Sequence, residues 1–283
     1  MILLGLLRLY RFDAFVLFTL VYLLGVTAAS STFPPLHEIV VALIVSGVSI
    51  NFIYSLNSWA DADIDAINKP SRPIPAGVVT RRQALVYSLF LLGVSLVYPF
   101  FLFGFSVKTL LCLWLPAAGL LYSNPSYPFK KNRLLALLTI TATVFVVALL
   151  GYVANFGVFS TSFYFSALTL IITCAGVIPL KDLSDARGDA AYGAENWFSG
   201  GGNVILRGSI LLALAIVSAL YSGQWLALLL TCWNAVLFGL LMILYIKGKI
   251  PPDRLYRNVL IAVILGLAVA VGYAVYLRYV SLF

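Results

Sequence analysis

Long apolar runs alternate with short polar interruptions along almost the whole chain. An apolar window of about 17 to 25 residues is long enough to cross the hydrocarbon layer of a bilayer as a helix. The pattern predicts nine such windows, at residues 13–30, 37–58, 83–104, 107–123, 134–154, 161–181, 203–221, 224–246 and 257–280. The predicted fold class is therefore an all-α polytopic membrane protein with nine transmembrane helices.

Composition and charge agree with a chain embedded in a lipid bilayer. The 283 residues are 62% hydrophobic and 10% charged, and the net charge is +8. In a soluble protein this charge would suggest nucleic acid, but here we interpret it as a topology signal and expect no nucleic-acid partner. With nine spans and a cytoplasmic N-terminus, all lysines and arginines except Lys108 and Arg278 fall on the cytoplasmic side. We therefore expect a multi-pass protein of the cytoplasmic membrane, with its N-terminus in the cytoplasm.

The polar interruption after the second window carries three aspartates within five residues. If the helix continues through Asp65, then Asn57, Asp61 and Asp65 stand four residues apart and lie on one stripe of the helix. Asp63 points to nearly the opposite side, so we expect it to be solvated. Pro70 cannot lie inside a helix, so the helix should end before it.

A second acidic stretch, KDLSDARGD, follows the sixth window. Asp182, Asp185 and Asp189 are spaced three and four residues apart, which again gives one helix face. The two stretches hold six of the ten acidic residues and are about 120 residues apart. Both are predicted to face the cytoplasm.

The equivalent positions of the acidic stretches suggest an internal repeat. We expect a single domain, residues 1–283, built from two four-helix units at about 13–123 and 134–246 and a ninth helix at 257–280. A parallel repeat of this kind would bring the acidic faces together across a central cavity.

Carboxylates gathered in this way repel one another unless something positive lies between them. Mg²⁺ favours carboxylates together with the oxygens of a bound phosphate, so we expect Mg²⁺ as the cofactor. The predicted metal ligands are Asn57, Asp61, Asp65, Asp182, Asp185 and Asp189, of which Asp61, Asp65, Asp182 and Asp185 are the predicted catalytic residues. A diphosphate would be repelled by this acidic face unless the metal ions bridged the two.

Basic and hydroxyl groups near the acidic stretches could contact such a diphosphate directly. The predicted diphosphate-binding residues are Lys69, Arg72, Tyr122, Lys130, Lys131 and Lys181. The chain also has 16 tyrosines, 19 phenylalanines and 5 tryptophans, so an isoprenoid tail would be soluble in the helix bundle. If the diphosphate leaves an allylic carbon, aromatic faces and exclusion of water would stabilise the developing cation.

These motifs resemble those of the UbiA-type intramembrane prenyltransferases. The resemblance rests on N-x-x-x-D-x-x-x-D from Asn57, the continuation NKPSRPIPAG, the elements around Tyr122 to Lys131, and KDLSDARGD. It implies a nine-helix bundle with a cytoplasmically capped cavity and transfer of an isoprenyl group from a prenyl diphosphate to an acceptor. It also implies Mg²⁺ held by the two aspartate motifs and a diphosphate held by the nearby basic residues.

The acceptor stays open between two lipophilic classes, the aromatic ring of a quinone precursor and a glycerol-phosphate ether lipid. NKPSRPIPAG is similar to archaeal digeranylgeranylglyceryl phosphate synthases and to some quinone-pathway enzymes, whereas Ser58 departs from the usual start of the first motif. Two other functions compete with prenyl transfer. A cation-coupled transporter would also use carboxylates between repeats, but usually near the bilayer midplane. A phosphatidyl-type transferase would gather its acidic residues in one short stretch.

Overall fold

The structure, a computed structural model, describes residues 2–29, 34–153, 161–195, 197, 204–222 and 225–280, and these contain helices and no strand. The α-helices are α1 (Ile2–Leu9), α2 (Phe12–Ala29), α3 (Leu36–Ile44), α4 (Asn51–Ala60), α5 (Ala62–Asn68), α6 (Arg81–Phe103), α7 (Val107–Ser123), α8 (Arg133–Val153), α9 (Thr161–Val177), α10 (Asp182–Ala191), α11 (Val204–Ser222), α12 (Trp225–Ile246) and α13 (Pro252–Val280). Short helices of other pitch are the π-helix η1 (Val45–Ile50) and the 3₁₀-helices η2 (Phe129–Lys131) and η3 (Ile178–Lys181).

The described helices account for every apolar window predicted from the sequence. Seven helical segments in the described part of the chain are long and apolar enough to cross a membrane, and Val107–Ser123 and Leu206–Tyr221 are shorter apolar helices. The prediction of an all-helical, multi-pass membrane protein is confirmed at this level. The window-edge residues Ser30, Ala154, Asn203 and Gln224 lie outside the described residues.

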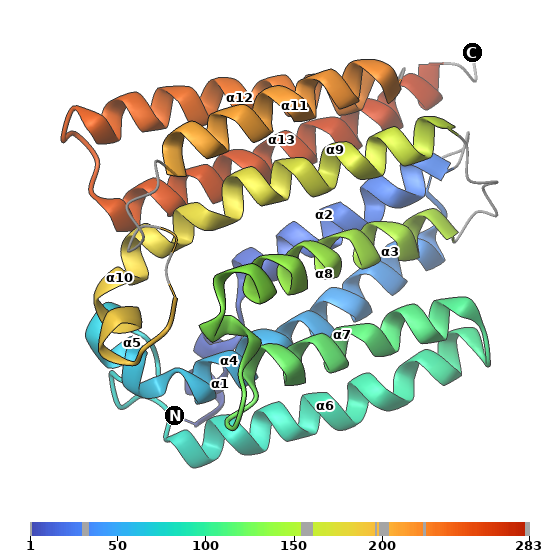
Figure 1. Cartoon of the computed structure of the whole chain (residues 1–283). Coiled ribbons are helices and arrows are strands. Elements are labelled where there is room, and N and C mark those ends of the chain that lie inside the picture. The colour runs from blue at the N-terminus through green and yellow to red at the C-terminus, as the bar shows by residue number, and fades with distance from the viewer. Residues whose placement is uncertain are drawn as a thin grey trace.

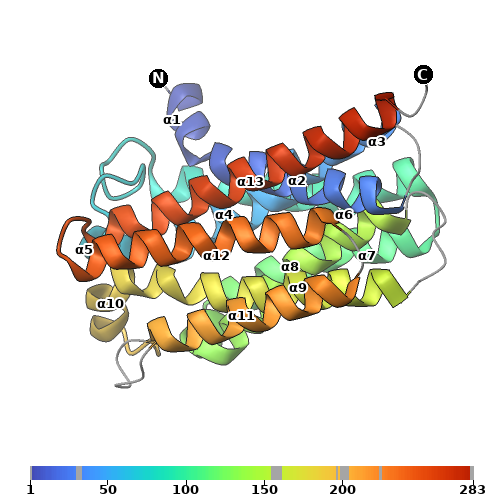
Figure 2. The ribbon, with the colours of Figure 1, turned by 90° about the horizontal axis from the view of Figure 1, so that it is seen from above.

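The long helices lie side by side, with their axes roughly along one direction (Figure 1). The short helices α5 and α10 lie at the same end of this bundle in both views, and α13 ends at the other end (Figures 1 and 2). Since α5 and α10 follow the helices that enter this end, the two acidic stretches meet although they are far apart in the sequence.

The central helices α2 and α8 pack closely because glycines face each other's backbones. A Cβ atom added to Gly25 would lie 2.0 Å from the carbonyl oxygen of Ala148, and one added to Gly151 would lie 2.0 Å from that of Tyr22. Only hydrogen fits at either position. Small residues of this kind allow membrane helices to approach closely and gain van der Waals contact.

The second apolar segment changes pitch before it reaches the acidic stretch. The π-helix η1 contains a wider turn than an α-helix, and the Asn51 side chain at its end donates to the Ser46 carbonyl at 3.1 Å. Further on, Asp61 separates α4 from α5 with φ −94° and ψ 9°. The hydrogen bonds nevertheless continue, because the Asp61 N–H donates to Asn57 at 2.8 Å and the Asp65 N–H to Asp61 at 2.7 Å. The predicted four-residue stripe is confirmed.

Candidate active site

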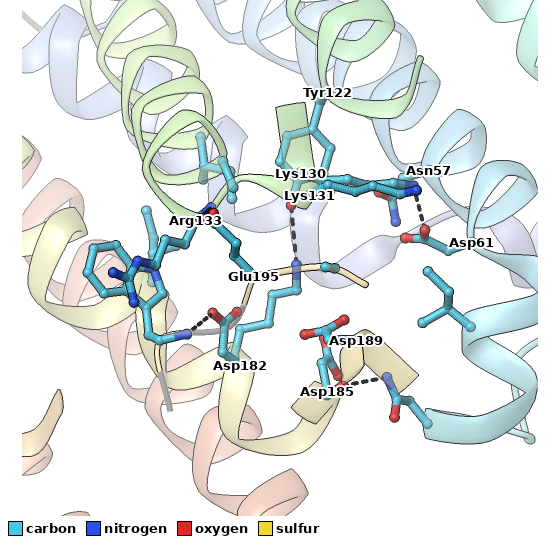
Figure 3. A pocket seen from close by; sticks show the side chains of 18 of the residues that line it. Asn57, Asp61, Tyr122, Lys130, Lys131, Arg133, Asp182, Asp185, Asp189 and Glu195 are labelled. Carbon is cyan, nitrogen blue, oxygen red and sulfur yellow. Dashed lines mark hydrogen bonds and ion pairs between the residues drawn. The ribbon is translucent and has the colours of Figure 1, made fainter. Parts of the chain in front are cut away.

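One polar pocket of about 80 Å³ collects the residues predicted from both acidic stretches. All twelve predicted site residues line it: Asn57, Asp61, Asp65, Lys69, Arg72, Tyr122, Lys130, Lys131, Lys181, Asp182, Asp185 and Asp189. Figure 3 shows Asp61 approaching from the α4–α5 side and Asp182, Asp185 and Asp189 from α10. Asp63 is exposed, as predicted, and lies outside the pocket, where it pairs with Arg81 at 3.0 Å.

Three of the aspartates in the pocket form ion pairs with basic residues in the described part of the chain. The pairs are Lys130 with Asp61, Arg72 with Asp65 at 2.5 Å, and Lys69 with Asp185. The last of these pairs connects the segment after α5 to α10. Each predicted metal-binding carboxylate in these pairs thus has a predicted phosphate-binding cation beside it.

The charges that line the pocket are balanced in number. Six carboxylates and six cations line it; beyond the predicted residues, these include Glu195 and Arg133. A bare diphosphate would give this site a large excess of negative charge, which divalent cations bound with it would remove.

Asn68 joins the two acidic helices through its side chain, which bonds to the backbone of α10. Its side-chain amide donates to the Asp185 carbonyl at 2.9 Å, and its carbonyl oxygen accepts from the Gly188 N–H at 2.8 Å. A Cβ atom on Gly188 would lie 2.5 Å from the Asn68 side-chain nitrogen. The residue type at position 188 therefore sets how closely α5 and α10 approach each other.

The segment after α7 forms one wall of the pocket and is fixed by residues that follow α10. Glu195 donates its N–H to the Lys131 carbonyl at 2.8 Å and accepts at its side chain from the Arg133 N–H at 3.2 Å. The Arg133 guanidinium lies 5.2 Å from the centroid of the Trp197 ring. Trp197 also donates its N–H to Asp182 at 3.2 Å. These contacts hold Lys130 and Lys131 over the acidic residues.

Tyr122 and Lys181 lie where the polar pocket meets the interior of the bundle. The Lys181 ammonium donates to the Tyr122 hydroxyl at 3.3 Å, and the two residues come from α7 and η3. Both predicted phosphate-binding groups are therefore close together, at the boundary where a charged head would give way to an apolar tail.

Burial changes the proton affinities of several groups at the polar end, Asp65 and Lys69 among them. It raises the pKa of the Asp65 carboxyl above its usual value, against the opposing charge of Arg72, and the Asp61 carboxylate raises this pKa further. Burial lowers the pKa of Lys69, against the opposing charge of Asp185, and the neighbouring charges of Arg72 and Lys181 also lower it. Both shifts disfavour the charged forms.

The carboxylate and amide oxygens that line the pocket are of the kind that Mg²⁺ prefers as ligands. Three of the carboxylates, however, contact the basic residues with which they pair. No group of three or more acidic, histidine or cysteine side chains is gathered at ligand spacing in the described part of the chain. The Asn57 side-chain oxygen is buried and accepts no hydrogen bond from the described residues, although it lines the pocket. A buried oxygen without a partner is costly, and a hard cation would satisfy it.

A cavity of about 1090 Å³ extends from the polar pocket into the bundle. The two spaces share lining residues, including Asn57, Tyr122 and Lys181. Apolar and aromatic side chains form most of the inner wall, among them Phe18, Val21, Phe145, Leu170, Val263 and Leu267. A ligand with a charged head and a long hydrocarbon tail could occupy both spaces at once.

Fold and site together define a helical membrane protein in which a charged pocket at one end of the bundle opens into an apolar cavity. The chain belongs to the UbiA prenyltransferase family, which it matches over residues 16–254.

Two curated relatives show what the chain is similar to in sequence. The chain is 29% identical over 180 residues to the digeranylgeranylglyceryl phosphate synthase of Thermococcus sibiricus, covering 62% of this chain and 61% of that protein. It is 38% identical over 144 residues to the synthase of the same name from Methanoregula boonei, covering 50% and 48%. The match spans only about half to three fifths of the length of these two relatives.

The fold is also similar to a solved structure of a UbiA homologue from Archaeoglobus fulgidus bound to GPP and Mg²⁺. The TM-score is 0.72, with 19% sequence identity and coverage of 96% of this chain and 99% of that one. At this level of identity the comparison concerns the fold.

The sequence reasoning missed several residues of the site. Asn68, Arg133, Glu195 and Trp197 line the pocket but were not among the predicted residues. Asn68 directly precedes the predicted Lys69, so its position was a usable signal. Glu195 and Trp197 follow the second acidic helix after a turn, and nothing local indicates that they contact the segment after α7.

Proposed function

We propose that the protein catalyses Mg²⁺-dependent transfer of an isoprenyl group from a prenyl diphosphate to a lipophilic acceptor within the membrane. The observation that carries this proposal is the direct opening of the charge-balanced polar pocket into the 1090 Å³ cavity. The family membership and the GPP and Mg²⁺ bound to the Archaeoglobus homologue support it.

The proposed metal ligands are the predicted oxygen donors at the ends of α4, α5 and α10. They are Asn57, Asp61, Asp65, Asp182, Asp185 and Asp189. When bound, Mg²⁺ would neutralise the charge that develops on the departing diphosphate. Lys69, Arg72 and Lys130 would then turn from their carboxylates toward the diphosphate oxygens, where Lys131, Lys181 and Tyr122 also contact it.

The proposed reaction breaks the bond between the allylic carbon and the diphosphate oxygen, and the diphosphate leaves with the electron pair. The apolar cavity excludes water, and its aromatic walls stabilise the allylic cation. An acceptor oxygen then donates an electron pair to the same carbon to form an ether. Its proton passes to the departing diphosphate, which provides the bases nearest the reacting carbon.

Between the two acceptor classes, we propose the glycerol-phosphate ether lipid. The names of both curated relatives describe synthases of a digeranylgeranylglyceryl phosphate. The aromatic ring of a quinone precursor has less support. The enzyme would therefore act in lipid biosynthesis, and the donor would be a long prenyl diphosphate.

The proposed topology has nine transmembrane helices around the cavity, in a single domain of residues 1–283. Two units, about 13–123 and 134–246, and the helix at 257–280 would build it. The occurrence of α5 after α4 and of α10 after α9, at the same end of the bundle, supports this repeat. The distribution of lysines and arginines supports an N-terminus and an active site at the cytoplasmic face.

The test is an assay of the whole chain in lipid nanodiscs with a labelled prenyl diphosphate and a glycerol phosphate that already carries one isoprenyl ether. We expect diphosphate release that requires Mg²⁺ and matches ether product one to one. Full turnover in excess chelator would contradict the proposal. Because the carboxylates lie at the end of the bundle, a cation-coupled transporter is not favoured. Cation uptake into sealed liposomes that contain the protein, without diphosphate release, would instead support one.

A further inference from the structure

A second group of basic side chains lines the large cavity, apart from the diphosphate pocket. The cavity is lined by six cations and one carboxylate, Asp13. Lys69, Arg72 and Lys181 also line the polar pocket, whereas the other three cations line only the cavity. These three are Arg8, Arg11 and Arg257, from α1, the α1–α2 turn and α13.

Arg11 is the best-positioned of the three. Its backbone N–H donates to the Asn51 side chain at 3.0 Å, which fixes the α1–α2 turn against the start of α4. Its guanidinium donates to Asp13 through Nε at 2.9 Å and Nη2 at 2.6 Å, and lies 5.1 Å from the centroid of the Tyr54 ring. A guanidinium has five N–H bonds. Contacts with the described residues use two of these N–H bonds, so the others remain for a ligand.

Membrane orientation alone does not require this placement. A charge that only orients the chain has to lie on one side of the membrane and can remain in water. Arg254 fits that description, since it is exposed and lines neither of the two cavities. Arg11 is instead partly buried beside a cavity whose walls are mostly apolar. Asp13 pairs with it, but among the described residues this is one carboxylate against the six cations that line the cavity.

We infer that Arg11, assisted by Arg8 and Arg257, binds the phosphate monoester of the lipid acceptor. The inference rests on the proposed function and assigns the acceptor head to a subsite different from that of the donor diphosphate. A guanidinium binds phosphate oxygens through paired N–H bonds. Asp13 holds the guanidinium edge that carries Nε, so the edge that carries Nη1 faces the ligand.

The two anion subsites adjoin the same tyrosine in the cavity wall. Tyr256 lines the cavity and interacts electrostatically with both Lys181 and Arg11. Glycerol phosphate is short, so a phosphate held at Arg11 brings the free hydroxyl of the glycerol toward the donor carbon near Lys181. The isoprenyl chain already on the acceptor then extends into the same apolar cavity as the donor tail.

The experiment measures acceptor use and acceptor binding separately, with the whole chain in nanodiscs of zwitterionic lipid. The acceptor is a glycerol phosphate with one isoprenyl ether, and its dephosphorylated form is the comparison ligand. In Arg11→Gln we expect the acceptor KM and Kd to rise roughly 10- to 100-fold, as for loss of a charge-assisted pair. The donor KM, the Mg²⁺ dependence and the Kd of the dephosphorylated form should stay unchanged.

Matched variants separate recognition from damage to the fold. Arg254→Gln removes an arginine from the same end of α13 as Arg257 and should change none of these constants. Arg11→Gln with Asp13→Asn removes both charges of the ion pair, so no carboxylate is left without its cation, and it should weaken binding like Arg11→Gln alone.

Three results would overturn the inference: unchanged acceptor Kd in both Arg11 variants, equal weakening for the two acceptor forms, or equal weakening in Arg254→Gln. If the unaltered chain transfers no prenyl group, the proposed function fails. The acceptor Kd would still show whether Arg11 binds the phosphate of the acceptor.

Discussion

The side chain of Asn68 holds the backbone of α10 through hydrogen bonds to the Asp185 carbonyl and the Gly188 N–H, and its approach to Gly188 leaves no room for a Cβ atom. This contact fixes the separation of the two acidic helices. It acts through backbone atoms, so the aspartate side chains remain available for the pocket.

The Asn68–Gly188 contact predicts a loss of activity from the smallest possible substitution. In Gly188→Ala the added carbon would lie 2.5 Å from the Asn68 nitrogen, so either the Asn68 side chain gives up its hydrogen bonds to α10 or α10 itself shifts. Displacing reacting groups by about 1 Å can cost about 100-fold in rate, and we expect a loss of that size in Mg²⁺-dependent diphosphate release. Gly239→Ala on α12, where nothing lies within 4 Å of the new atom, is the control. Equal rates in the two variants would contradict the role given to this contact.

Removing one carboxylate from either acidic stretch should abolish turnover. Loss of a partner in the second shell of a metal costs 10- to 100-fold, so loss of a ligand should exceed about 100-fold. We expect this in Asp61→Ala and in Asp182→Ala, measured as diphosphate release by chromatographically monodisperse protein. Asp63→Ala, at an exposed residue paired with Arg81, should retain the original rate. Near-normal turnover in either pocket variant would exclude the metal assignment.

The raised pKa of Asp65 predicts how metal affinity depends on pH. Because this pKa lies above that of an ordinary aspartate, the carboxyl takes up its proton at a higher pH as the solution is acidified. The neutral carboxyl neither pairs with Arg72 nor binds Mg²⁺ well. The Mg²⁺ concentration for half-maximal rate should therefore rise with acidification well before pH reaches about 4. A flat profile down to that pH would contradict the prediction.

The close packing of α2 and α8 predicts a stability defect far from the active site. In Gly25→Ala the new carbon would lie 2.0 Å from the Ala148 carbonyl oxygen, which belongs to a helix backbone and cannot move alone. Overpacking of this kind costs about 1–3 kcal/mol or more, which should lower the thermal unfolding midpoint in detergent. Gly93→Ala on α6 has open space around the new atom and should be neutral or mildly stabilising. Equal midpoints would show that the helices can separate without cost.

Patterns within short stretches of the sequence predicted those structural features that depend on residues close together along the chain. The apolar windows predicted the long helices because a membrane helix must be apolar over its own length. The spacing of Asn57, Asp61 and Asp65 predicted their common stripe, because the four-residue hydrogen bonds persist through the turn at Asp61. The clustering of all twelve predicted residues in one pocket follows from the return of the chain to the same end of the bundle.

Features that depend on contacts between distant segments were not predictable in this way. The pairing of Lys130 with Asp61 and of Lys69 with Asp185 joins residues that only the tertiary fold brings together. The same holds for Glu195, whose contacts with the segment after α7 have no local signature. The π-helix η1 was missed because its sequence, VSGVSI, continues the apolar pattern of an ordinary helix.

The π-helix gives the second segment a rotational phase that an uninterrupted α-helix would lack. Each residue of an α-helix turns the chain by about 100°, whereas each residue of the wider η1 turns it less, so η1 holds about one residue more than an α-helical stretch of the same total turn. If these residues formed a regular α-helix at the same chain length, everything beyond them would turn by about 100°, and Asn57 would leave the stripe that meets α10. A deletion of one residue that also restored regular pitch would leave this orientation almost unchanged. The pitch of η1 is thus as strict a requirement as the identity of the aspartates, although the hydropathy of the segment hardly depends on it.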